Sequence, residues 1–132
     1  MVLIAMEGGG QKFVLESTDE AKLIGTFSIG PIGAWTSCHE DTEAGADYQV
    51  PTDKVFTITK IVCFGSGTGY LDMKYHTVAN NSGGTRIGFF SNMLNGINSF
   101  DYLVNVPAGN YVNTQPNTAN FKVYILGVEH DA

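Results

Sequence analysis

Positive charge is scarce in this chain of 132 residues. Seven Lys and Arg residues stand against thirteen Asp and Glu residues, which gives a formal net charge of −6, and Arg86 is the only arginine. Nucleic acids and anionic membrane surfaces are bound by clustered basic side chains, whereas the lysines here are scattered singly. We therefore expect neither a nucleic-acid partner nor a membrane partner.

Long apolar runs are also missing. No run approaches the ~20 residues of a membrane-spanning helix. The first six residues are apolar, but Glu7 and three glycines follow, and the positive segment and longer apolar core of a signal peptide are not seen. This pattern favours an N-terminal arm or a first strand within residues 1–10. It predicts a cytoplasmic location or, for a viral protein, a place in the virion.

Cysteine is limited to Cys38 and Cys63, and no CxxC motif occurs. A redox or zinc-binding role is therefore not expected. The sequence leaves open whether the two cysteines pair. Cys63 lies within an apolar run, which is typical of a small core residue.

What the chain has in abundance is turn-forming residues and short alternating segments. Glycine accounts for 16 residues, and the clusters Gly8–Gly10, Gly65–Gly67 and Asn80–Gly84 favour tight reversals. Over Tyr70–His76, apolar and polar residues alternate, as in a strand with one buried and one exposed face. Short strands separated by such turns predict a sandwich or a barrel.

The richest β segment is Lys54–Phe64, where the apolar residues change phase across Thr59-Lys60. This predicts a bulge or a bend, although an unbroken strand also fits. The segment Phe121–Leu126 is apolar on both faces, as expected of a central strand or of one that a partner covers. Helix-like sequence is limited to Ser17–Lys22 and Ser91–Asn95, about one turn each. Further strands are expected at Lys12–Glu16, Leu23–Ile29, Ile87–Phe90, Phe100–Val106 and Tyr111–Thr114.

A weak internal sequence repeat indicates how the strands are connected. In both Tyr48–Val55 and Val104–Tyr111, a strand ends at Val-Pro, turns and restarts. Two similar Greek-key halves would produce such a repeat, and a jelly roll contains two Greek keys. We therefore expect one domain over residues 1–132, an all-β jelly-roll β-sandwich of about eight antiparallel strands.

Candidate metal ligands gather in one acidic segment. Glu40, Asp41, Glu43 and Asp47 offer the oxygen ligands that Ca²⁺ prefers, but their order is not that of an EF-hand loop. A solvated acidic loop is the simpler interpretation. The three histidines match no metal or catalytic spacing, and no nucleophile elbow or phosphate loop occurs. We expect no catalytic residues, no cofactor and no enzyme activity.

Aromatic residues suggest a second class of function. Trp35, Tyr70 and Tyr102 could form a platform on which sugar rings stack, with Asn and Asp side chains binding the hydroxyl groups. The competing interpretation is that these rings pack at core edges and subunit contacts. The alternative function is thus a carbohydrate-binding β-sandwich module, with Ca²⁺ in the acidic segment in one version.

The segment Pro107–Asn113 is similar to the second motif of the cupin family, in which Pro-x-Gly precedes a metal-binding histidine. Val112 stands at the position of that histidine, and the first cupin motif is missing. The resemblance implies a jelly-roll turn and leaves a divergent cupin-like metal enzyme as a third hypothesis.

Three strings together resemble a loose pattern in bacteriophage and viral structural proteins: Val50–Ile61, Val106–Gly109 and Ile125–Glu129. There the pattern accompanies small jelly-roll domains of capsid-decorating, head-fibre and tail-fibre-tip proteins. This chain has Pro-Thr-Asp at the first turn, where that group often has Pro-Ala-Gly. The resemblance implies self-assembly, often as trimers, without catalysis, and capsid or tail proteins or a surface glycan as further partners. A non-enzymatic, homo-oligomeric virion protein is therefore the expected function.

Overall fold

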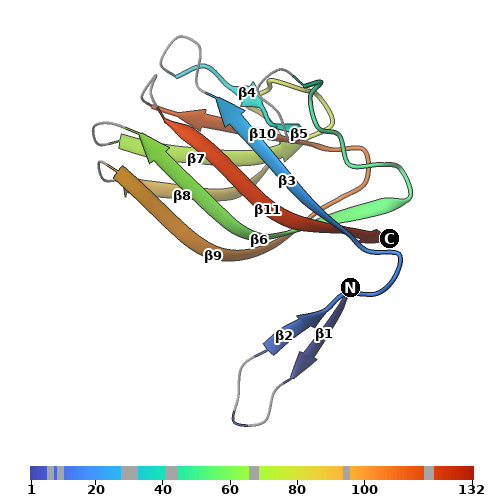
Figure 1. The fold of residues 1–132 in the computed structure, drawn as a ribbon. Coiled ribbons are helices and arrows are strands. Elements are labelled where there is room, and N and C mark those ends of the chain that lie inside the picture. Colours follow the sequence, from blue (N-terminus) through green and yellow to red (C-terminus); the bar gives the residue numbers. More distant parts are fainter. Residues whose placement is uncertain are drawn as a thin grey trace.

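The computed structural model describes residues 1–5, 8, 11–27, 33–40, 45–65, 69–93, 96–117 and 121–132. Their regular structure consists of β-strands in three antiparallel sheets (Figure 1). A two-stranded hairpin contains β1 (Val2–Ala5) and β2 (Gln11–Val14). A five-stranded sheet has the order β5 (His39–Glu40), β3 (Glu20–Phe27), β11 (Lys122–Asp131), β6 (Lys54–Gly65) and β9 (Gly96–Val106). A four-stranded sheet has the order β4 (Thr36–Ser37), β10 (Tyr111–Pro116), β7 (Gly69–His76) and β8 (Thr85–Met93).

The two larger sheets pack face to face, so the predicted all-β sandwich is confirmed. Apolar side chains from both sheets form one buried core, including Ile24, Ile61, Leu71, Met73 and Val112. The described residues contain eleven strands, where about eight were expected. A strand was expected at Lys12–Glu16, where β2 lies, so the hairpin adds β1 alone. The other two additional strands are the short β4 and β5, which flank Cys38 and join different sheets.

The predicted irregularity in β6 is confirmed. Buried side chains move from Phe56 and Ile58 to Ile61 and Cys63, so the inward-facing parity changes across Thr59. The register with both neighbouring strands shifts at the same place. An extra residue in one strand rotates the following side chains to the opposite face. The bulge therefore lets both halves of this long strand contribute to one core.

The helix-like interpretations were wrong where the structure describes them. Within Ser17–Lys22, a single turn is closed by a hydrogen bond from Asp19 N to Glu16 O, and β3 already begins at Glu20. Of Ser91–Asn95, the first three residues belong to β8, and the last two lie outside the described residues. Pairing with long neighbouring strands overrides the weak local preference for a turn of helix.

Part of the outer face of the four-stranded sheet, over β10 and β4, is covered by the chain's own loop of residues 77–84. Asn113 of β10 is fully buried, and its Oδ1 accepts a hydrogen bond from Ser37 Oγ at 2.7 Å. Its Nδ2 donates to Val78 O at 3.1 Å and to Asn81 O at 3.3 Å. The loop is therefore fastened over β10 and β4 by a buried side-chain amide.

Cys38 and Cys63 are both buried and free. Burial raises the pKa of each thiol to about 12, so the reactive thiolate is scarce at neutral pH. We expect neither thiol to react with a small alkylating reagent at pH 7.5 in the folded protein, and both to react in 6 M guanidinium. Mass spectrometry of the labelled chain measures this, and rapid labelling of one thiol in the folded state would contradict the packing described.

No helix of the described residues is long and apolar enough to cross a membrane.

Candidate functional site

The N-terminal hairpin projects away from the sandwich (Figure 1). Its strands pair with each other from Val2 opposite Val14 to Ala5 opposite Gln11, and within the described ranges no third strand joins this sheet. Six of the eight paired residues are apolar. Val14, the last residue of β2, and the following Leu15 are exposed, Leu15 to 55%. A two-stranded hairpin by itself is at best marginally stable in water, because it has no second layer to cover it.

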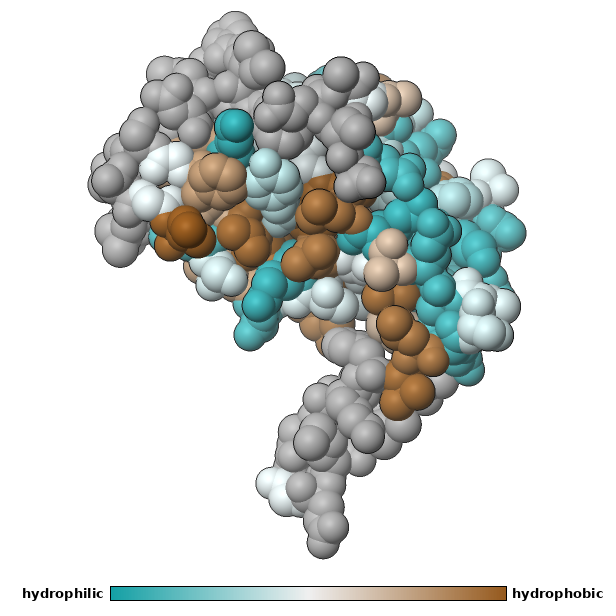
Figure 2. All heavy atoms as spheres, viewed as in Figure 1, coloured by the Kyte–Doolittle hydropathy of each residue, from teal (hydrophilic) through white to brown (hydrophobic). Residues whose placement is uncertain are grey.

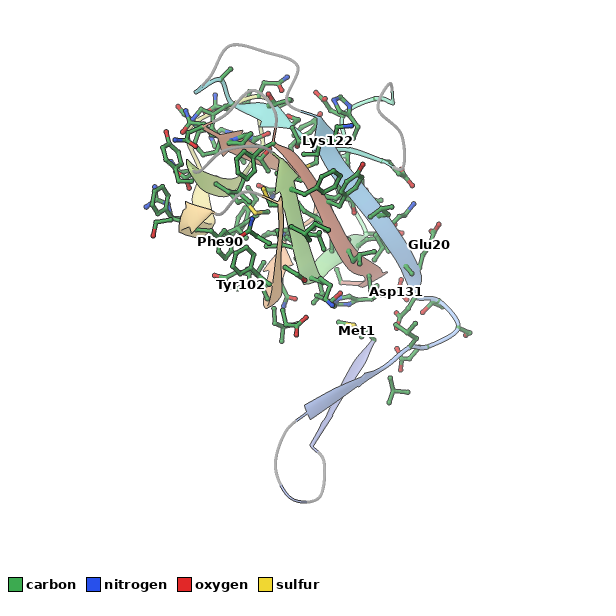
Figure 3. All side chains as sticks on the ribbon, turned by 60° about the vertical axis from the view of Figure 1, so that its left-hand side comes forward. Met1, Glu20, Phe90, Tyr102, Lys122 and Asp131 are labelled. Atoms are coloured by element: carbon green, nitrogen blue, oxygen red, sulfur yellow. The ribbon has the colours of Figure 1, made fainter. Side chains whose placement is uncertain are left out.

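The base of the hairpin is fixed by Asp19, whose side chain is almost fully buried. Its Oδ2 accepts a hydrogen bond from Glu16 N at 2.8 Å and forms an ion pair with the Met1 amino group. The hydrogen bond from Glu16 N, followed by the interaction with Met1, lowers the pKa of the Asp19 carboxyl group, so it is ionised near neutral pH. In Figure 3 Met1 lies at the foot of the sandwich near Asp131. Asp19 therefore holds together the residue before β1 and the segment after β2, and the hairpin extends outward from there.

A second apolar surface lies on the outer face of the five-stranded sheet. We call it the apolar outer face, and its members come from four neighbouring strands: Leu23, Val62, Phe64, Ile97, Tyr124 and Leu126. Leu126 is opposite Leu23 and is 41% exposed, and Ile97 is opposite Phe64 and is 78% exposed. The rings of Phe64 and Tyr124 stack at 5.4 Å between centroids. Figure 2 views this sheet as in Figure 1 and shows brown, apolar side chains gathered on it.

Charge on this face is sparse and largely paired. Lys60 Nζ lies 3.5 Å from Asp101 Oδ1 across β6 and β9, and Lys122 is opposite Phe64 at the end of β11. On the other side of the sandwich, the loop of residues 77–84 contacts Asn113 of β10 and Ser37 of β4, whereas Phe89 of β8 remains exposed. Exposed contiguous apolar patches on soluble proteins mark interaction sites.

An acidic groove of about 590 Å³ lies at the other edge of the five-stranded sheet, between β3, β11 and the segment before β6. The Tyr48 hydroxyl donates a 2.8 Å hydrogen bond to Glu129 Oε1, and both side chains are buried. Burial and then the hydrogen bond to Glu129 raise the pKa of Tyr48, which keeps it a donor. Lys22 Nζ contacts Glu40 and Glu20. Burial opposes the charge of Lys22, but the surrounding carboxylates raise its pKa overall. These polar groups chiefly bind one another and tie the segment before β6 to the sheet.

The four predicted calcium ligands are not shown as a group. Glu40 pairs with Lys22, and Asp47 Oδ1 lies 3.5 Å from His39 Nδ1. Asp41 and Glu43 lie outside the described residues. Within the ranges that the structure describes, no three His, Cys, Asp or Glu side chains are placed to hold a metal ion.

The three predicted sugar-stacking residues lie on two different surfaces. Trp35 carries Lys74 Nζ over its ring at 5.1 Å, and Tyr70 of β7 packs against Phe89 with 5.3 Å between centroids. Both belong to the four-stranded side of the molecule. Tyr102 instead extends from β9 toward the core, where its hydroxyl donates to Ile87 O at 2.6 Å and its ring meets Phe90 edge-on. Figure 3 shows Phe90 and Tyr102 side by side.

Val112, which occupies the histidine position of the cupin-like motif, is fully buried in the core. Its carbonyl accepts a hydrogen bond from Cys38 N at 2.9 Å. The side chain therefore packs between the sheets and supplies no ligand atom.

Sequence reasoning found part of the apolar outer face and missed the rest. The two apolar faces of residues 121–126 indicated that Tyr124 and Leu126 need a cover. Ile97 was missed because Gly96, Asn98 and Ser99 surround it in its strand, and Leu23 because its neighbour Ile24 faces the core. Only the register joins the two residues to the patch. One signal in the sequence could have helped to find the patch. In Gly96–Val106 the even-numbered residues from Phe100 onward face the core, so the odd-numbered residues face outward.

Comparison with family models, with curated proteins and with solved structures gave no match.

Proposed function

We propose that this chain is a non-enzymatic structural protein that assembles with copies of itself. The observation that carries the proposal is the hairpin of β1 and β2, which projects from the sandwich with mostly apolar strands and no covering layer among the described residues. Such an element becomes stable when a partner covers it. A homo-oligomer provides that cover without any further component, because every copy carries the same arm.

The free energies of burial and association require a contact that covers several apolar residues. Full burial of one Leu, Ile or Val side chain contributes about 1.5–3 kcal/mol. Association costs roughly 4–15 kcal/mol in lost rotational and translational freedom. One or two covered side chains are therefore insufficient. By the register of the hairpin its six apolar residues divide three to each face, so the assembly requires that apolar residues outside the hairpin are covered as well. Closed assemblies, in which each copy gives and receives such a contact, gain most from this arrangement.

We further propose a jelly-roll connection of the sandwich strands. Apart from short β5, the strands pair as one long hairpin that has been rolled up: β3 with β11, β4 with β10, β6 with β9, and β7 with β8. This nesting of first with last strand supports two Greek keys in one sandwich. Together with the resemblance to viral jelly-roll proteins, it favours a virion component, with a trimer as the oligomer that the resemblance implies.

The molar mass in solution tests the proposed function. Light scattering after size exclusion should give a multiple of the 14.2 kDa chain mass at tens of micromolar. A variant with charge in both strands of the arm, L3D/V14D, should elute as a monomer with an unchanged circular dichroism spectrum. A wild-type chain that remains a monomer at 100 µM would refute the proposal.

A glycan-binding module is the second candidate, and the pair Tyr70 and Phe89 favours it. Phe89 is 50% exposed, and Arg86 lies beside it with its guanidinium 5.6 Å from the ring centroid. Arg86 also makes two hydrogen bonds to Asp72, at 3.0 and 3.1 Å. Aromatic rings beside paired polar groups suit a sugar with one apolar face and several hydroxyl groups. Binding on a glycan array that F89A abolishes would support this function, and a blank array would count against it.

A further inference from the structure

We infer that the N-terminal hairpin of one copy packs on the apolar outer face of another copy. This inference rests on the proposed self-assembly and names the surface that receives the arm. Both surfaces belong to every chain, so a head-to-tail contact between copies satisfies both at once.

The hairpin is held away from the apolar outer face of its own chain. Its base is fixed by the turn at Glu16–Asp19 and by the contacts of the Asp19 carboxylate, and the strands run outward from there (Figure 1). Among the described residues, no strand of the same sandwich pairs with the hairpin. On the apolar outer face of the same chain, Leu126 and Leu23 likewise remain exposed.

The two surfaces agree in size. Four residues of paired strand span about 13 Å, at roughly 3.3 Å per residue. On β11 the outward-facing residues from Lys122 to Leu126 span a similar length, and the apolar outer face extends sideways over β6 and β9. A two-stranded layer can thus lie on this sheet as a small third layer, with apolar side chains meeting as they do between packed sheets.

The charges of the two surfaces also permit contact between copies. A chain with a net charge of −6 resists self-association wherever its acidic side chains meet. The paired strands of the hairpin carry only Lys12 as a charged residue, and on the outer face Lys60 is paired with Asp101. Acidic side chains such as Glu20, Glu40 and Asp47 gather instead around the groove beyond β3. Contact between arm and outer face therefore brings no excess of carboxylates together.

A complementation experiment tests the pairing of these two surfaces. The arm variant L3D/V14D retains the outer face, and the face variant L126D/I97D retains the arm. Each alone should be monomeric, whereas an equal mixture at 100 µM should give a 1:1 complex of about twice the chain mass, because one arm and one face remain. The matched control V78D changes an exposed Val of the other side of the sandwich and should assemble like the wild type.

The outcomes separate this inference from the proposed function. A monomeric wild type overturns both. An oligomeric face variant leaves self-assembly intact but overturns the outer face as the receptor of the arm. Two monomeric variants that stay monomeric when mixed would indicate that arms bind arms and faces bind faces, which also overturns the inference. Should L126D perturb folding, I97D alone tests the same surface, since Ile97 is 78% exposed.

Discussion

Asn113→Ala should destabilise the sandwich by about 2–4 kcal/mol. The substitution removes the acceptor of Ser37 Oγ and the donor to Val78 O and Asn81 O, in a position that is fully buried. Each buried hydrogen bond contributes about 0.5–1.5 kcal/mol, and groups left unpaired add a desolvation penalty. Asn113 Oδ1 also accepts from Asn80 N at 3.2 Å, so the loop of residues 77–84 loses its fastening to β10.

Urea unfolding followed by tryptophan fluorescence measures this change, because Trp35 lies on the same side of the sandwich. Asn105→Ala is the matched control, since Asn105 is exposed and accepts one hydrogen bond from Thr57. The control should cost less than about 1 kcal/mol. Equal losses in the two variants would show that the Asn113 network does not fasten the loop.

Phe56→Ala should have the largest effect, a loss of about 3–5 kcal/mol in the free energy of unfolding. The Phe56 ring is fully buried and meets the Tyr48 ring edge-on at 5.1 Å between centroids. It also lies directly over Gly127, where a Cβ atom would stand 2.4 Å from the ring. Truncation leaves a cavity that the surrounding strands can close only in part.

The same truncation at an exposed ring provides the comparison. Phe89→Ala removes a phenyl group that is 50% exposed and should cost roughly 1 kcal/mol or less. Thermal unfolding by calorimetry ranks the two variants. A Phe56 variant as stable as the Phe89 variant would contradict the position of Phe56 in the core.

The sequence was sufficient for the fold class because alternation and turn chemistry are local signals. The bulge in β6 could be predicted, since the change of phase is visible within one segment. Strand β3 could not be placed correctly at its start, because Glu20 joins it only by pairing with Glu129, far away in the chain. Local preference at Ser17–Lys22 indicates a helical turn, but pairing with β11 places Glu20 and the following residues in strand β3.

The candidate assembly surface was predictable only in outline for the same reason. Apolar residues at the N-terminus and on both faces of the last strand indicated that something must cover them. The outer face itself depends on the register of four strands, which brings Leu23 and Ile97 beside residues from distant segments. The alternation of residues 100–106 was a local signal that Tyr102 points inward, whereas only the tertiary structure shows that Tyr70 packs against Phe89.

Amide hydrogen exchange of the hairpin tests the central claim most directly. If another copy covers the arm, the amides of β1 and β2 should be protected at high protein concentration and should exchange rapidly on dilution, while β6 and β11 stay protected throughout. Exchange of the hairpin amides within seconds at every concentration would contradict the account, as would protection that persists in a monomeric chain.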